Sequence, residues 1–150
     1  MKIPSEYFSK GYAIRDSKKK KWYVNIAFAS SKMRKPFAIF VTTNHKESSE
    51  VTDDTITELL KLAINAGIHS DVVQAFVDSK INKVSNINKI TKTLSLLLRH
   101  NVRISDIVDV LDDGNYPLSS FTFHIKRLLK QFIPDGAEVE GKLVKSVVDK

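Results

Sequence analysis

Cysteine is absent from the 150-residue chain, which excludes disulfides, thiolate nucleophiles and cysteine-ligated metal sites. Long apolar runs are absent too, because stretches such as 24–29 and 37–41 are far too short to cross a bilayer. The first ten residues lack the apolar core of a signal peptide. We therefore expect a soluble cytoplasmic protein that does not associate with membranes.

Clustered glycines and paired catalytic groups are also missing. The 5 glycines are too dispersed to form a phosphate-binding loop. Two acidic pairs, Asp53-Asp54 and Asp112-Asp113, fall at a helix start and in a turn, where acids serve as caps or turn formers. The histidines stand at no metal-ligating spacing; they are His45, His69, His100 and His124. We expect no metal, no cofactor and no enzymatic activity.

Positive charge is present in excess, and it is concentrated in one region. The formal net charge is +7, and residues 1–50 alone contain 11 Lys or Arg against 4 Asp or Glu. The remainder of the chain is nearly balanced. Such a regional patch is typical of proteins that bind polyanions.

The first fifty residues predict a small antiparallel sheet. Residues 22–29 alternate apolar and other side chains with the period of a half-buried strand. The segment 11–15 is rich in β-formers, and the polar residues 16–19 have the length of a hairpin connection. Residues 36–43 predict a third strand, with Pro36 at its first position.

From residue 51 the apolar spacing becomes helical. Caps at Thr52 and Asp53 precede a helix that Gly67 ends, and Ser70 is predicted to cap the next. A polar linker at 80–86 separates this pair from a second one, in which Ser105 is the predicted cap. Ser70-Asp71 falls on Ser105-Asp106 at an offset of thirty-five residues. We expect αα-hairpins at about 53–78 and 87–112.

The last helix is predicted at 119–132, and Pro134-Asp135-Gly136 stops it. The expected fold class is α+β: about three strands in a basic antiparallel sheet (1–50), about five helices (51–136) and a tail (137–150). One compact domain is expected at this length.

The strongest binding signal is the lysine run followed by two aromatics, Trp22 and Tyr23. Lysines beside rings on a sheet can hold a phosphate backbone while a ring stacks on a base. The alternative is a solvated hairpin tip that protects a sheet edge, with Trp22 in the core. The predicted anion-binding or nucleic-acid-binding residues are Lys18, Lys19, Lys20, Lys21, Tyr12, Tyr23, Arg34 and Lys35.

A second signal is the spacing of Ala63, Gly67 and Val73, which matches a DNA-binding helix-turn-helix. This spacing is common in any αα-corner. The second helix, 71–78, has two acids and no base, so it would repel the DNA backbone.

Three segments together resemble the TSCPD-type region near the C-terminus of adenosylcobalamin-dependent ribonucleotide reductases. These segments are Lys21-Trp22-Tyr23-Val24, Pro36 to Val41, and Leu59 to Ala63 closing at Gly67-Ile68. Residues 94–102, Ile107-Val108 and 132–136 resemble the helical stretch that follows. The resemblance covers about residues 10–140.

This resemblance implies an appendage outside the catalytic barrel. A cysteine-bearing tail commonly accompanies the region in that family, and this chain has no cysteine. Radical, reducing and disulfide-shuttling roles therefore transfer to no residue here, and an accessory role is what the resemblance implies.

Two functions follow as expectations. The first is a non-catalytic accessory or regulatory module, associated with a ribonucleotide reductase, that presents its basic sheet to an acidic protein surface or another anionic partner. A protein partner would contact a helical face around Phe121 and Phe123. The alternative is a stand-alone protein that binds single-stranded nucleic acid or RNA through the same patch.

Overall fold

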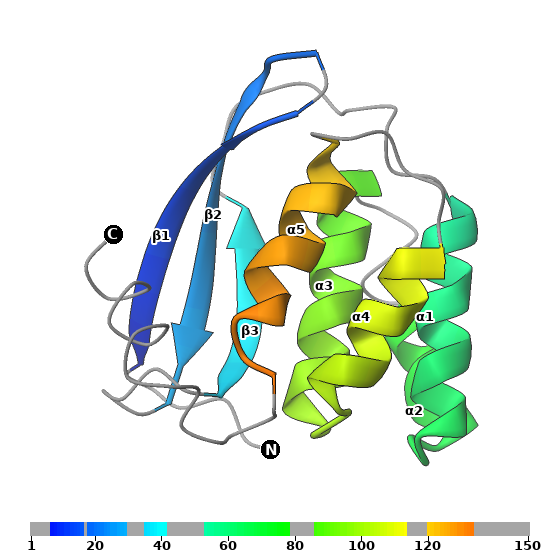
Figure 1. Cartoon of the computed structure of the whole chain (residues 1–150). Helices are drawn as coiled ribbons and strands as arrows, with labels where there is room; N and C mark the ends of the chain where they lie inside the picture. Colours follow the sequence, from blue (N-terminus) through cyan, green and yellow to red (C-terminus); the bar gives the residue numbers. More distant parts are fainter. Residues whose placement is uncertain are drawn as a thin grey trace.

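The computed structural model describes residues 7–16, 18–29, 35–41, 53–78, 86–113 and 120–133. Three strands form one antiparallel sheet in the order β1-β2-β3, and five helices follow (Figure 1). The predicted α+β class is confirmed. The elements are β1 Phe8–Arg15, β2 Lys21–Phe28, β3 Pro36–Val41, α1 Asp53–Asn65, α2 Ser70–Phe76, α3 Asn86–Arg99, α4 Ile104–Asp113 and α5 Phe121–Lys130.

The described elements stack in three layers. α3 packs on β3 and α5 on β1, so these two helices cover one face of the sheet. On their other side lie α1 and α4, and α2 joins this outer layer through α1 (Figure 1). The sheet thus has an inner face toward the helices and an outer face away from them.

The period-two pattern of β2 produces this division. Its inner-face residues Trp22, Val24, Ile26 and Phe28 are all buried in the main core. The Trp22 ring meets Phe121 of α5 edge-on, with ring centroids 5.7 Å apart. Trp22 is therefore a core residue, as the alternative interpretation of the lysine run assumed.

The two helix pairs, α1–α2 and α3–α4, are joined by connections of the same backbone geometry. α1 ends at Gly67, whose φ of 98° suits glycine, and Ile68 N donates to Ala63 O. α3 ends in the same way at Asn101, with φ of 59° and a bond from Val102 N to Leu97 O. At each corner the left-handed residue also donates a bond to the helix: Gly67 N to Ile64 O and Asn101 N to Leu98 O. Two such bonds and a left-handed residue form the Schellman motif.

These corners correspond at an offset of thirty-four residues, one fewer than the matching Ser-Asp pairs predict. The predicted caps at Ser70 and Ser105 are wrong, because each of these serines lies inside its helix. His69, not Ser70, caps α2, since its Nδ1 accepts from Asp71 N at 3.1 Å. Ser105 lies inside the first turn of α4, and its buried hydroxyl has no hydrogen-bond partner among the described residues.

The prediction that Asp112 and Asp113 lie in a turn is wrong, because both residues belong to the last turn of α4. Ser120 caps α5 by accepting from Phe123 N at 3.2 Å. Asp112 of α4 is tied to Lys126 of α5 at 2.8 Å, and this bond lowers the pKa of the carboxyl. The linker is predicted at 80–86, but Asn86 already begins α3. The rest of that linker (80–85), the predicted cap at Thr52, the stop at 134–136 and the tail 137–150 lie outside the described residues.

Candidate nucleic-acid interface

The β1–β2 hairpin presents the lysine run, and a buried aspartate holds its shape. Asp16 is 3% exposed and uses both carboxylate oxygens. One oxygen accepts from Lys18 N and Lys20 N, each at 2.9 Å, and the other accepts from Trp22 Nε1 at 3.0 Å. This carboxylate links the exposed loop to the core tryptophan, so the lysines stand on an organised turn.

The turn itself uses a left-handed residue. Lys19 N donates to Asp16 O at 2.9 Å, and Asp16 N donates to Lys20 O at 3.0 Å. Lys19 adopts a φ of 66°. This combination is the common three-residue hairpin loop in which the last loop residue is left-handed. Lys18 and Lys19 are consequently exposed at the tip, while Lys20 and Lys21 are half-buried below it.

Charge continues from the tip onto the outer sheet face. Arg15 pairs with Lys21 across β1 and β2, and Arg15 Nη1 donates to Lys19 O at 3.2 Å. Lys21 Nζ lies 5.2 Å from the centroid of the Tyr23 ring, which is 48% exposed. A cation and an open aromatic ring are thus adjacent on one surface.

Among the described residues of the sheet, the side chains next to Tyr23 are small and none is acidic. The neighbours of Tyr23 on β1 are Ala13, directly across, and Gly11, which pairs with Asn25. A Cβ at Gly11 would lie 3.0 Å from Asn25 Oδ1, so this close approach favours glycine. None of the three strand segments contains Asp or Glu. The outer face can therefore approach a phosphate backbone without like-charge repulsion.

Two of the predicted site residues belong elsewhere. Tyr12 pairs with Val24 and packs against the core on the inner face, so it cannot stack with the same ligand strand as Tyr23. Lys35 precedes Pro36, which pairs with Phe28 at the far end of β2, about 23 Å from Lys21 at the usual strand rise. Lys35 therefore does not share a surface cluster with the lysine run, although both were predicted to bind the same anion, and Arg34 lies outside the described residues.

Sequence reasoning missed Arg15, Tyr7 and Phe40. The Phe40 side chain is 41% exposed, and Phe40 pairs with Asn25 on the outer face, diagonal to Tyr23. Tyr7 stacks on Phe40, with centroids 6.2 Å apart and the ring planes inclined by 30°. Strand alternation from Tyr23 and across the hairpin would have placed Arg15 beside Lys21. The position of Phe40 beside Tyr23 follows only from the register of β3 against β2, which the sequence does not fix.

The predicted protein-binding face around Phe121 and Phe123 is not available as an apolar surface. Phe121 is fully buried against Trp22. Phe123 is half-buried, and two cations cover its ring: Lys126 Nζ at 4.9 Å and Arg127 at 5.8 Å from the centroid. This prediction failed because α5 turns its first phenylalanine toward the sheet.

The helix-turn-helix spacing has a packing explanation. Ala63 and Val73 are buried where α1 and α2 meet, and Gly67 forms the turn. The exposed side of α2 carries Asp71 and Gln74, and the Gln74 amide donates to Asp78 at 2.9 Å. An acidic helix of this kind is unsuited to the major groove.

Comparison with family models, with curated proteins and with solved structures found no match to this chain. Within the described residues, no group of three histidine or acidic side chains is placed to hold a metal ion. No helix in this part of the chain combines the length and apolarity of a membrane span.

Proposed function

We propose that this protein is a non-catalytic binding module that holds single-stranded nucleic acid on the outer face of its sheet. The observation that carries the proposal is the exposed ring of Tyr23, adjacent to Lys21 on a sheet whose strands contain no acid. Lysines and arginine bind phosphates, and an open ring stacks on any base. A duplex offers no unstacked base, so a single strand fits this surface better.

The first experiment is fluorescence anisotropy with labelled single-stranded DNA, RNA and duplex at two salt concentrations. The hairpin variant replaces Lys18, Lys20 and Lys21 with Gln, and Lys19 with Gly to suit its left-handed backbone. Each lost phosphate contact should reduce the log–log salt slope by about 0.7 for a single strand. We expect weaker binding and a slope reduced by up to about three units.

A matched control removes four positive charges from other surfaces: Lys61, Arg103, Arg127 and Lys130 to Gln. This control should bind nearly as tightly as the parent. Equal losses of affinity in both variants would mean that net charge alone drives binding. If the parent does not bind at low salt, the proposal is wrong.

Stacking is tested separately from charge. Tyr23→Leu keeps an apolar side chain but removes the aromatic face. Base stacking on an aromatic side chain contributes about 1–3 kcal/mol per base, so affinity for a single strand should fall roughly tenfold or more. Unchanged affinity would show that Tyr23 does not contact bases.

A second candidate is an accessory module of a ribonucleotide reductase, as the sequence resemblance implies. The supporting observation is that α1 and α2 expose Ile64 (48%) and Val72 (43%) in the outer helical layer, away from the lysine run. Association with a reductase should then survive in the hairpin variant and weaken with Ile64→Ser and Val72→Ser. Pull-down with a purified reductase catalytic subunit tests this, and loss of association in the hairpin variant alone would contradict it.

A further inference from the structure

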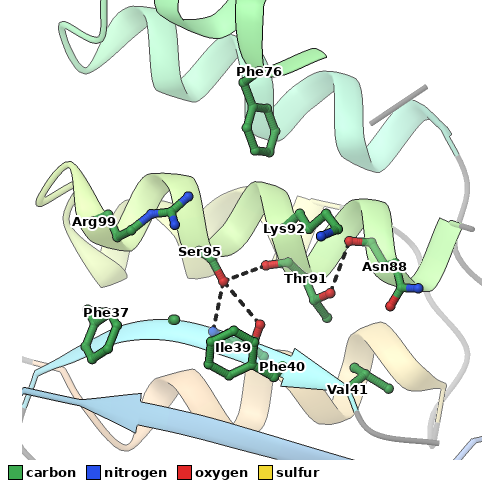
Figure 2. Close-up of a pocket in the computed structure, with 11 residues that line it drawn as sticks. Phe37, Ile39, Phe40, Val41, Phe76, Asn88, Thr91, Lys92, Ser95 and Arg99 are labelled. Carbon is green, nitrogen blue, oxygen red and sulfur yellow. Dashed lines mark hydrogen bonds between the residues drawn. The ribbon is translucent and has the colours of Figure 1, made fainter. Parts of the chain in front are cut away.

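A groove of about 380 Å³ runs along the side of α3. On one side of α3 the groove is lined by β3, through residues that include Phe37 and Phe40, and on the other side of α3 by Phe76 of α2 (Figure 2). Its volume is at the lower end of the range for small-ligand sites. The groove therefore suits one compact unit of a ligand.

Positive charge lies along the length of this groove. Lys92 and Arg99 both line it, and they are separated by seven residues, about 10 Å along the helix axis (Figure 2). None of the residues that line it is acidic, and α3 has no Asp or Glu in its whole length. Phe37 and Phe76 are buried, so Phe40 is the exposed aromatic ring among the lining residues. One open ring beside two cations is complementary to a nucleotide, with its flat base and anionic phosphate.

The hydroxyls between the two cations are already engaged within the protein. Ser95 Oγ accepts from Ile39 N at 2.9 Å and lies within bonding distance of the carbonyls of Ile39 and Thr91 (Figure 2). Thr91 Oγ1 donates to Asn88 O at 3.1 Å. Recognition would then come from ring faces and charge, which tolerate any base.

Phe40 connects this groove to the sheet face. It lines the groove from β3, while its ring stacks with Tyr7 on the outer face and lies diagonal to Tyr23. A strand lying across Tyr23 and Phe40 therefore reaches the groove by passing over the edge of β3.

We propose that the groove is a second nucleotide subsite for the same single strand. One base lies against the exposed ring of Phe40, and the neighbouring phosphates bind Lys92 and Arg99. This inference rests on the proposed function, and it predicts that the bound strand covers both the sheet face and the side of α3.

The test is anisotropy with single-stranded oligonucleotides of increasing length and a fixed composition. The groove variant is Lys92→Glu with Arg99→Gln, and its matched control is Arg103→Glu with Lys130→Gln, which lie outside the groove. We expect the groove variant to bind short oligonucleotides like the parent. For long ones, affinity should fall by about tenfold, and the salt slope by about 1.4 for two lost phosphate contacts.

The outcomes separate the two proposals. Groove and control variants that match the parent at every length would overturn the groove subsite while leaving the sheet face intact. Failure of the parent to bind any oligonucleotide would overturn both. The single variant Lys92→Glu changes only an exposed side chain, so it tests the groove if the double variant does not fold. Thermal unfolding of each variant checks that the fold is retained.

Discussion

Asp16 organises the candidate interface more than any other single residue. Its carboxylate is buried, and three N–H donors satisfy it: two from the lysine loop and one from the Trp22 indole. A buried carboxylate without such donors would be strongly destabilising. The lysine tip and the core are therefore coupled through one side chain.

Lys19→Gly should stabilise the protein. The parent residue has a φ of 66°, which costs a residue with a Cβ about 1 kcal/mol, whereas glycine adopts it freely. Glycine also has more conformational entropy in the unfolded chain, which offsets part of this benefit. We therefore expect the free energy of unfolding to rise by about 0.5 kcal/mol. Urea unfolding measures this change. Lys18→Gly is the control and should destabilise, and a loss of stability in Lys19→Gly would contradict the turn assignment.

Tyr12 should titrate as an unusually weak acid. Burial raises the pKa of its hydroxyl from 10.0 to about 12. This oxygen is buried near Gln131 but has no hydrogen-bond partner of ordinary geometry among the described residues. The Gln131 amide donates to Leu128 O at 3.2 Å. The neutral hydroxyl is the form that the fold favours.

Because the folded pKa of Tyr12 exceeds the unfolded one, its contribution to stability is complete below pH 10 and is lost as the pH rises toward 12. Ultraviolet titration of the folded protein should show a tyrosine ionising near pH 12, absent in Tyr12→Phe. If the same late step persists in that variant, the assignment is wrong.

At the scale of elements, Ser95 joins α3 to the sheet. Its hydroxyl accepts the Ile39 N–H at 2.9 Å, so α3 satisfies a backbone group on the open edge of β3. A strand edge left unpaired is a site for unwanted pairing with other chains. This contact also holds the floor of the groove against its β3 wall.

Ser95→Ala should destabilise the fold by about 1–3 kcal/mol, because it leaves the buried Ile39 N–H without its partner. Thr93→Val is the control: its hydroxyl only donates to Lys89 O within the same helix, so its loss should cost less. Thermal or urea unfolding compares the two variants. An equal cost in both would indicate that the α3–β3 contact contributes little.

At the scale of the whole molecule, acidic residues are unevenly distributed among the layers of the described elements. The strands, α3 and α5 contain no acidic residue, whereas α1, α2 and α4 contain eight acids and one lysine. In Figure 1 the sheet lies on one side of the α3–α5 layer and the acidic helices on the other. The electrostatic potential of the described elements is therefore more favourable to a polyanion on the sheet side than on the side of α1, α2 and α4.

Added charge on the acidic layer should change nucleic-acid binding little. The double variant Asp54→Lys with Asp109→Lys raises the net charge by four units at exposed sites of α1 and α4. The α3–α5 layer, about 10 Å thick, separates these sites from the sheet. This separation is comparable to the screening length at physiological salt. We expect less than about threefold change in anisotropy-measured affinity. A rise as large as the loss in the hairpin variant would mean that net charge, not the sheet face, governs binding.

The amino-acid sequence by itself determined the elements and the basic bias. Period-two alternation in β2 and the turn at Gly67 each fixed local structure, because backbone preference and the burial of one face agree there. The lysine run and the core position of Trp22 were likewise readable. The cap at His69 was not, because Ser70 is the better cap by type and a one-residue shift leaves the apolar pattern nearly unchanged.

Only the tertiary structure decided which side chains share a surface. The strand register separated Lys35 from the lysine run and put Tyr12 and Tyr23 on opposite faces. Packing of α3 against β3 brought Lys92 and Arg99 to Phe37 and Phe40, more than fifty residues away in the chain. Such placements depend on how whole faces pack against one another, and local propensity contains no information about them.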